Sequence, residues 1–195
     1  MLKKIVLSSM IASSVFASHQ FEINLSDEDV EAGVRFDLSR TNNIEGDTYL
    51  DLRVLNGDSK NSDVIGNPDP LLEGSFLIMP PVDNILGLRI GLGVKLAWTE
   101  IEKDDYIAVP LGVELEWRLP IVSPIPVYVG GAFYYAPDPL CFSDADRYLE
   151  QRANLDIEVI RNGRITLGYR DVDTDIKTRD IVYNETVYAG FKFLF

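Results

Sequence analysis

Cysteine is almost absent from this chain, because Cys141 is the only one among 195 residues. No intramolecular disulfide can form, which excludes the small secreted scaffolds that disulfides hold together. Cys141 itself is interpreted as an incidental loop residue rather than a nucleophile. If the chain is exported, its stability must come from its core or from a membrane.

Basic residues are scarce as well: 18 Lys and Arg stand against 31 Asp and Glu, a net charge of −13. Such an acidic chain is a poor partner for nucleic acid, whose phosphates require basic surfaces. No stretch after the first residues approaches 18 apolar residues, so the sequence predicts no transmembrane helix. Outside that beginning, no run has a helical period.

The first 17 residues have the pattern of a secretory signal peptide. Lys3 and Lys4 precede a short apolar segment, residues 5–16, and Ala17 supplies a small residue at the cleavage position. The segment is too short to span a membrane as a helix. We therefore expect a signal peptide at residues 1–17 and a single domain over residues 18–195.

What the sequence has instead is strict alternation, clearest in residues 85–121. Every second residue from Leu86 to Trp98 is apolar, and the pattern returns from Ile107 to Leu119 after a charged turn. A period of two predicts β-strands, whose successive side chains point to opposite faces. These arms exceed the ~5–6 residues of ordinary strands and suit the ~9–11 needed to cross a membrane.

Eight further alternating runs flank this hairpin, at residues 20–26, 32–40, 48–55, 72–79, 126–136, 148–161, 164–171 and 183–195. Ten strands, an even number, predict an all-β fold: a closed antiparallel up-and-down transmembrane β-barrel. The connections alternate in predicted length, with the odd ones long, acidic and extracellular and the even ones short and periplasmic. The first odd connection, residues 27–31, is shorter than this rule predicts.

The polar face of the strands carries charges of both signs, as a narrow lumen requires, because an unpaired buried charge is costly. The predicted lumen charges are Arg35, Arg53, Arg89, Lys95, Arg152, Arg164, Arg170 and Lys192, matched by Glu22, Asp37, Asp51, Glu73, Glu114, Glu116, Asp156 and Glu158. Most strand glycines fall on the same face, where we expect them to relieve crowding.

Aromatic residues are predicted to form two girdles at the edges of the lipid face. We expect Trp98, Tyr135 and Tyr183 near the outer edge, and Phe21, Trp117, Phe193 and Phe195 near the periplasmic edge. The last strand, with Phe191, Phe193 and Phe195 at every second place, looks like the C-terminal signature that barrel-assembly machinery recognises in outer-membrane proteins.

Several short motifs give the chain a resemblance to the YfaZ family of bacterial outer-membrane proteins. They are residues 134–138 (YYAPD), 142–146 (FSDAD), 148–150 (YLE), 168–170 (GYR) and 188–190 (YAG). The strand layout is similar along the whole mature chain. The resemblance implies a barrel fold and an outer-membrane location, but no reaction.

Sites for chemistry are few. The only histidine, His19, is predicted at the periplasmic end, where it cannot be the base of an extracellular catalytic site, so we expect no enzyme and no cofactor. Asp171, Asp173 and Asp175 have the spacing that opens a calcium loop, but Ile176 and Val182 replace the glycine and glutamate of an EF-hand. We interpret them as a solvated acidic loop, with a looser metal site as the alternative.

Three functional hypotheses remain. The first is a non-catalytic outer-membrane barrel with a narrow or closed lumen and a structural role in the cell envelope. The second is a small, porin-like diffusion channel that favours cations, and the third is a soluble secreted binding barrel. The first implies outer-membrane lipid and lipopolysaccharide as surroundings, assembly machinery as a transient partner, export through the periplasm, and a monomer.

Overall fold

The computed structural model describes residues 19–39, 47–56, 69–101, 104–121, 125–176 and 180–195, so the predicted signal peptide lies outside the described residues. These residues form strands joined by turns, with one 3₁₀ turn, η1 (Asp138–Leu140). The strands are β1 (Gln20–Leu25), β2 (Val30–Asp37), β3 (Asp47–Asn56), β4 (Leu71–Met79), β5 (Leu88–Ile101), β6 (Asp104–Ala108), β7 (Leu111–Arg118), β8 (Val127–Ala136), β9 (Cys141–Ser143), β10 (Ala145–Ile160), β11 (Gly163–Ile176) and β12 (Val182–Leu194).

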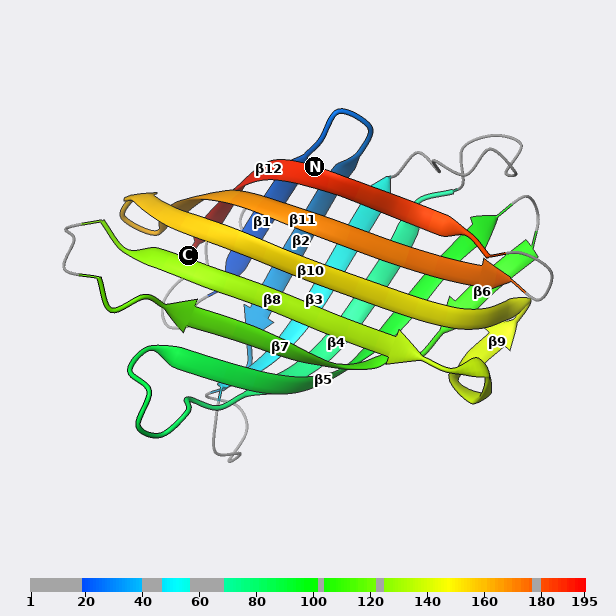
Figure 1. Cartoon of the computed structure of the whole chain (residues 1–195), viewed down its shortest axis with the longest axis horizontal. Helices are drawn as coiled ribbons and strands as arrows, with labels where there is room; N and C mark the ends of the chain where they lie inside the picture. Colours follow the sequence, from blue (N-terminus) through cyan, green and yellow to red (C-terminus); the bar gives the residue numbers. More distant parts are fainter. Residues whose placement is uncertain (1–18, 40–46, 57–68, 102–103, 122–124, 177–179) are drawn as a thin grey trace, which may run out of the picture.

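The strands close into one antiparallel barrel (Figure 1). The sheet order is β4-β3-β2-β1-β12-β11-β10-β8-β7-β5, and β5 pairs back with β4. The first and last strands meet along Gln20–Leu25 and Ala189–Leu194. The predicted closed antiparallel barrel of about ten strands is confirmed, and β6 and β9 are additions to it.

The two added strands arise where Pro110 interrupts the second arm of the central hairpin. Proline has no N–H to donate to the ladder, and at this point Lys95 N donates to the Pro110 carbonyl at 2.9 Å. β7 pairs with β8, whereas β6 pairs with β5 on one side and with β9 on the other. The predicted single arm is therefore split, and β6 and β9 extend the wall at one end.

We call the end with β6, β9 and the β11–β12 connection the upper end, and the end with the β10–β11 turn and both described termini the lower end. At the upper end, residues predicted to be connections continue the strands: Glu100 belongs to β5 and Asp173 to β11. The predicted contrast between long and short connections is therefore partly a contrast in how far the strands continue at the two ends of the barrel. Nowhere in the described ranges is there a helix long and apolar enough to span a membrane.

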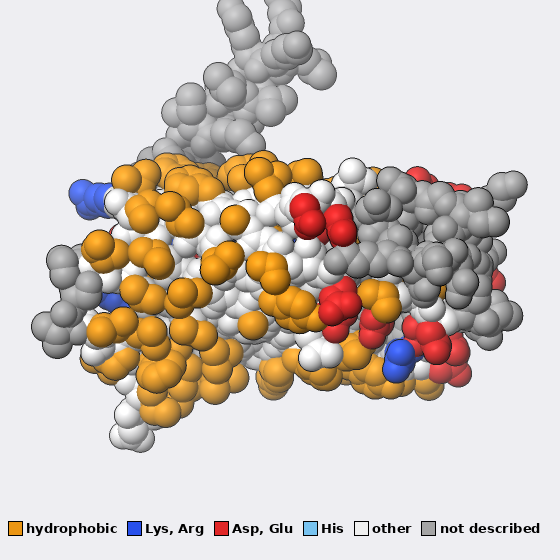
Figure 2. Space-filling view, turned by 45° about the horizontal axis from the view of Figure 1, so that its top comes forward, with side chains coloured by type: hydrophobic (Ala, Val, Ile, Leu, Met, Phe, Trp, Pro, Cys, Tyr) orange, Lys and Arg blue, Asp and Glu red, His pale blue; other side chains and the backbone are white. Residues whose placement is uncertain are grey.

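The outward face of the barrel is apolar around the middle (Figure 2). Alternation leaves one residue in two outside, and these are mostly aliphatic, with Leu92 71% and Leu167 57% exposed. Acidic side chains gather toward the upper end in the same view. An exposed apolar surface of this extent is far from what a water-soluble monomer shows.

One predicted girdle residue lies on the other side of the wall. Trp98 and Tyr135 are exposed on the outward face, but Tyr183 is fully buried inside the barrel. The reason is a β-bulge: Val172 pairs with Asn184 whereas Asp173 pairs with Val182, so Tyr183 is an extra residue in β12. A bulge shifts the alternation by one residue, and the prediction for Tyr183 was wrong.

Candidate functional site

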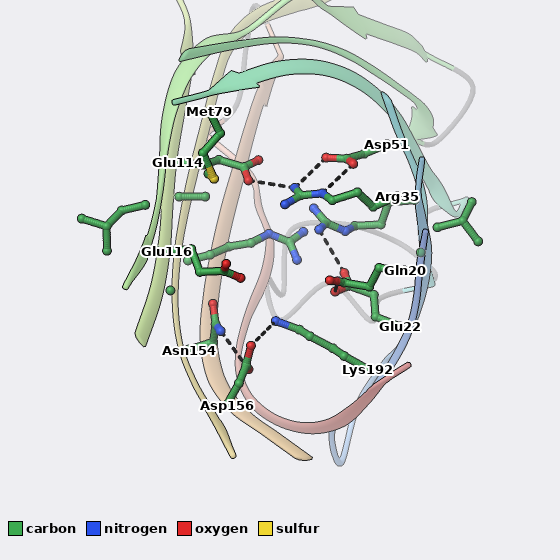
Figure 3. A pocket seen from close by; sticks show the side chains of 18 of the residues that line it. Gln20, Glu22, Arg35, Asp51, Met79, Glu114, Glu116, Asn154, Asp156 and Lys192 are labelled. Atoms are coloured by element: carbon green, nitrogen blue, oxygen red, sulfur yellow. Dashed lines mark hydrogen bonds and ion pairs between the residues drawn. The ribbon is translucent and has the colours of Figure 1, made fainter. Parts of the chain in front are cut away.

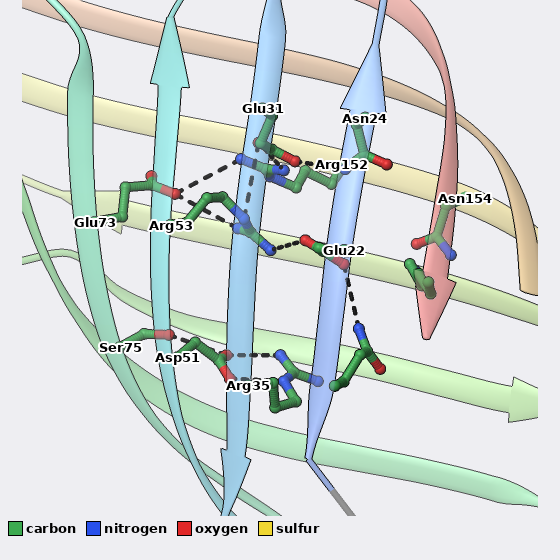
Figure 4. Close-up of polar contacts among 12 residues, drawn as sticks. Glu22, Asn24, Glu31, Arg35, Asp51, Arg53, Glu73, Ser75, Arg152 and Asn154 are labelled. Carbon is green, nitrogen blue, oxygen red and sulfur yellow. Dashed lines mark hydrogen bonds and ion pairs between the residues drawn. The ribbon is translucent and has the colours of Figure 1, made fainter. Parts of the chain in front are cut away.

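The candidate site is the lumen, because the inward residues of all ten barrel strands converge there. The sixteen predicted lumen charges lie on the inward side of their strands, and most form ion pairs, some with a neighbouring strand and some across the lumen. A set of seven residues, which we call the central network, joins opposite walls, and Figure 4 shows four of them, Glu31, Arg53, Glu73 and Arg152. Its members are Glu31, Arg53, Glu73, Lys95, Glu150, Arg152 and Arg170.

Glu31 is the hub of one half of this network. Its carboxylate is fully buried and lies 2.7 Å from Arg152 Nη1, 2.8 Å from Arg170 Nη1 and 3.7 Å from Arg53 Nε. β2 and β3 are thereby linked to β10 and β11 on the far side of the lumen. A carboxylate without these partners would carry a large desolvation penalty here.

Lys95 is the centre of the other half. Its ammonium pairs with Glu150 and, at 3.1 Å, with Glu73, and lies 4.4 Å from the centroid of the Tyr134 ring. The hydroxyl of Tyr148 donates to Glu73 Oε1 at 2.6 Å. Each of these buried charges therefore has a partner of opposite sign or a polar donor.

The short β1–β2 turn completes the network from above. Arg170 Nη2 donates to Asp29 Oδ1 at 2.6 Å, and Asn184 Nδ2 donates to Asp29 Oδ2 at 2.8 Å. Ser26 Oγ accepts the backbone N–H of Asp29 and shapes the turn. Asp29 in this short turn is thus buried in the lumen. Sequence reasoning placed Asp29 and Glu31 in an extracellular connection and missed Glu150.

Above the network, the lumen is filled by an apolar cluster that we call the upper plug. Its largest fully buried members are Tyr106, Tyr134, Tyr148, Tyr183, Leu55, Leu71 and Val172. The Tyr183 hydroxyl accepts from Leu71 N and donates toward Asp69 O, each at 2.9 Å, and so joins β12 to the start of β4. The sequence predicted a polar lumen throughout, and the plug was not anticipated.

Several lumen tyrosines have a glycine opposite them on the neighbouring strand. A Cβ at Gly112 would lie 2.4 Å from Cδ1 of Tyr134, and one at Gly168 would lie 2.4 Å from Cζ of Tyr188. Only glycine leaves room for these rings against the wall. These glycines thus relieve crowding in a specific way, because they leave space for the rings of Tyr134 and Tyr188.

Below the network the lumen is hollow and polar (Figure 3). Arg35 makes two 2.7 Å bonds to Asp51 and one of 2.8 Å to Glu114. Lys192 lies 2.9 Å from Asp156. These pairs line a cavity of about 80 Å³ between the walls.

The cavity leads to a wider mouth of about 330 Å³ at the lower end. Its polar walls are built from Arg89 on β5, Glu116 on β7 and Arg164 on β11. Arg89 Nη1 lies 3.7 Å from one Glu116 oxygen, and Arg164 Nη1 lies 3.3 Å from the other. Arg89 also pairs with Asp47 and donates to the Tyr49 hydroxyl.

The possible metal ligands do not converge. Asp175 is held by Arg147 at 2.6 Å, while Asp171 lies on the outward face opposite Glu185. Among the described residues, no group of three or more His, Cys, Asp and Glu is arranged to hold a metal ion.

Cys141 lies in β9 at the upper end, with its thiol 3.7 Å from the Ala136 carbonyl. Burial, with Asp138 and Asp146 nearby, raises its pKa to about 11. A thiol with such a pKa is a weak nucleophile at neutral pH.

The phenylalanines of the last strand, Phe191, Phe193 and Phe195, face outward at the lower end. Phe193 and Phe195 stack with ring centroids 6.3 Å apart, and Phe195 contacts His19 across the seam between the first and last strands. His19 Nδ1 accepts the backbone N–H of Asp37 at 3.3 Å.

Comparison with known proteins supplies the family. No curated protein matches the chain. The family profile described as "YfaZ precursor" matches residues 75–195, which is more than half of the chain and covers β5 to β12 with four of the seven residues of the central network. Together with the closed barrel, this match shows that the chain belongs to the YfaZ family.

Proposed function

We propose that the protein is a non-catalytic outer-membrane barrel whose lumen is closed and whose role is structural, in the cell envelope. The observation that carries this proposal is the succession of the central network and the upper plug across the lumen. Glu31 and Lys95 are each held from both walls, and Tyr183 is fully buried in the layer above them. A barrel of about ten strands has little internal space beyond its side chains.

The outward face supports a membrane location. Leu92 and its neighbours form an apolar band around the barrel, with Trp98 and Tyr135 at its upper edge and Phe193 at its lower edge. This is the surface that membrane barrels present to lipid. We infer that the acidic upper end faces outward among lipopolysaccharide, that the lower end faces the periplasm, and that the barrel is a monomer placed by the assembly machinery.

Two measurements test the membrane proposal. A closed barrel in detergent resists unfolding until it is boiled, so we expect its gel mobility to change on heating. The protein should also stay with membranes after carbonate extraction. Recovery in the soluble periplasmic fraction would favour the secreted binding barrel instead, although that protein would have to leave Leu92 and Leu167 in water.

A second function, a narrow cation-favouring channel, is favoured by the hollow lower lumen and by the acidic upper end. The upper plug argues against it, because ions would have to pass a filled layer of buried tyrosine rings and aliphatic side chains. Planar-bilayer recording of the refolded protein separates the two. We expect no stable openings. Porin-sized conductance would instead make the cation-favouring channel the better-supported function.

A further inference from the structure

We propose that the lower mouth is a binding site for an oxyanion, a phosphate or carboxylate group, held between Arg89 and Arg164. In the present arrangement Glu116 occupies the place of that anion. The inference goes beyond the proposed structural role, and the binding itself does not depend on it.

The first support is the way Glu116 is held. It bridges two arginines from opposite walls at 3.3 and 3.7 Å, whereas the deeper pairs Arg35–Asp51 and Lys192–Asp156 lie at 2.7 and 2.9 Å. Its side chain is also 33% exposed. A loosely held, accessible carboxylate between two guanidinium groups is one that a ligand can displace.

The second support is Arg164, whose guanidinium is already held in position to bind an oxyanion. Its guanidinium carbon lies 3.6 Å from the centroid of the Tyr128 ring, and the Tyr128 hydroxyl is held by Glu158 at 3.2 Å. Within the described structure, the buried Nε of Arg164 has no hydrogen-bond partner. Arginine binds phosphate and carboxylate best through two parallel N–H bonds, and Nε with one Nη provides such a pair.

The surrounding charges determine how strong the binding can be. Asp37 and Asp47 also line the mouth, and Asp47 remains on Arg89. Arg35 lines it too but is already engaged by Asp51 and Glu114. We therefore expect weak binding in the natural chain, limited mainly by Glu116. The mouth has the ~300 Å³ or more of a small-ligand site, enough for a phosphate or a phospholipid headgroup.

The decisive variant is Glu116→Gln. It keeps the size of the side chain but removes the charge that competes with the ligand, so inorganic phosphate should bind about tenfold tighter or more. Arg164→Gln should abolish binding in either background. Asp105→Asn removes the same charge from an exposed site at the upper end and should leave phosphate affinity unchanged. The measurement is phosphate titration of the refolded barrel in an uncharged, phosphate-free detergent.

Glu116→Asp covers the case in which Glu116→Gln fails to fold. It keeps the charge but withdraws the carboxylate by one methylene, so it should bind phosphate more tightly than the natural chain. If neither folded Glu116 variant gains affinity over Asp105→Asn, the proposal is overturned, and Glu116 is only a structural counter-ion. Heat-modifiable gel mobility establishes folding for each variant.

The source of the oxyanion is settled separately, by counting the phospholipids that co-purify with each variant in native mass spectrometry. More bound phospholipid in Glu116→Gln and none in Arg164→Gln would identify a lipid headgroup. Phosphate binding with unchanged phospholipid would identify a free anion. The lipid outcome also rests on the membrane location proposed above, whereas the phosphate titration does not, so failures of the two proposals can be told apart.

Discussion

Arg170 on β11 and Asp29 in the β1–β2 turn form an ion pair of 2.6 Å in which both side chains are completely buried. The two residues lie 141 positions apart, and their contact fixes the first turn of the barrel over the strand next to the last. Arg170 also binds Glu31 at 2.8 Å, so a single guanidinium joins the turn to the central network.

We expect Arg170→Met to destabilise the folded barrel by about 3–5 kcal/mol, because it leaves two carboxylates buried without this partner. Urea unfolding in lipid vesicles measures the change. Adding Asp29→Asn to Arg170→Met should recover part of the loss, since one uncompensated charge is then removed. Asp146→Asn, at an exposed position, serves as the control. Equal stability of Arg170→Met and the control would show that the pair contributes nothing.

The upper plug should be what keeps ions out. We predict that the double variant Tyr148→Ala with Tyr183→Ala conducts ions across planar bilayers where the natural chain does not. The change removes two of the largest side chains of the plug and releases Glu73 from the Tyr148 hydroxyl. The matched control, Tyr135→Ala with Tyr169→Ala, removes two outward-facing tyrosines. If the plug variant conducts no ions, the central network alone would be what closes the lumen.

The alternation of the strands made the barrel predictable from the sequence. Leu92 and Val113 are outward neighbours on β5 and β7. The residues that alternate with them along each strand, such as Glu114, point inward, because the side-chain period of a strand is fixed at two. The lumen charges follow from the same period. The intrinsic strand preference of the residues alone would not have predicted ten strands. The alternation predicted them, because a lipid-facing surface requires nearly every second residue to be apolar.

The plug and the network were less predictable because they depend on pairing across the barrel. The bulge that turns Tyr183 inward exists only in the register between β11 and β12, which no local pattern specifies. Asp29 is joined to the central network because its turn meets Arg170 in three dimensions. The first connection, residues 27–31, is shorter than the alternation of lengths predicts, but its length does not identify Arg170 as the partner of Asp29.

The assignment of faces can be tested with lysine at Leu92, which is 71% exposed. At the middle of a bilayer a lipid-facing lysine costs about 2–4 kcal/mol, so Leu92→Lys should unfold at clearly lower urea concentrations in vesicles than Leu92→Ala. The neighbouring Gly93 is unsuitable as a lumen control, because any Cβ there would lie 2.6 Å from the Tyr134 hydroxyl. Equal midpoints for the two Leu92 variants would mean that this face does not meet lipid.

The last prediction concerns the outward pair Asp171 and Glu185, which lie directly opposite each other on β11 and β12. Like charges that face each other across two strands destabilise the sheet. Asp171→Asn removes one charge of the pair, so it should stabilise the barrel by about 0.2–1 kcal/mol at pH 7, the size of a cross-strand side-chain interaction. Urea unfolding in lipid vesicles measures the change. Asp146→Asn removes a charge from an exposed site and should leave the stability unchanged. A barrel that gains no stability from Asp171→Asn would show that the two carboxylates do not repel each other.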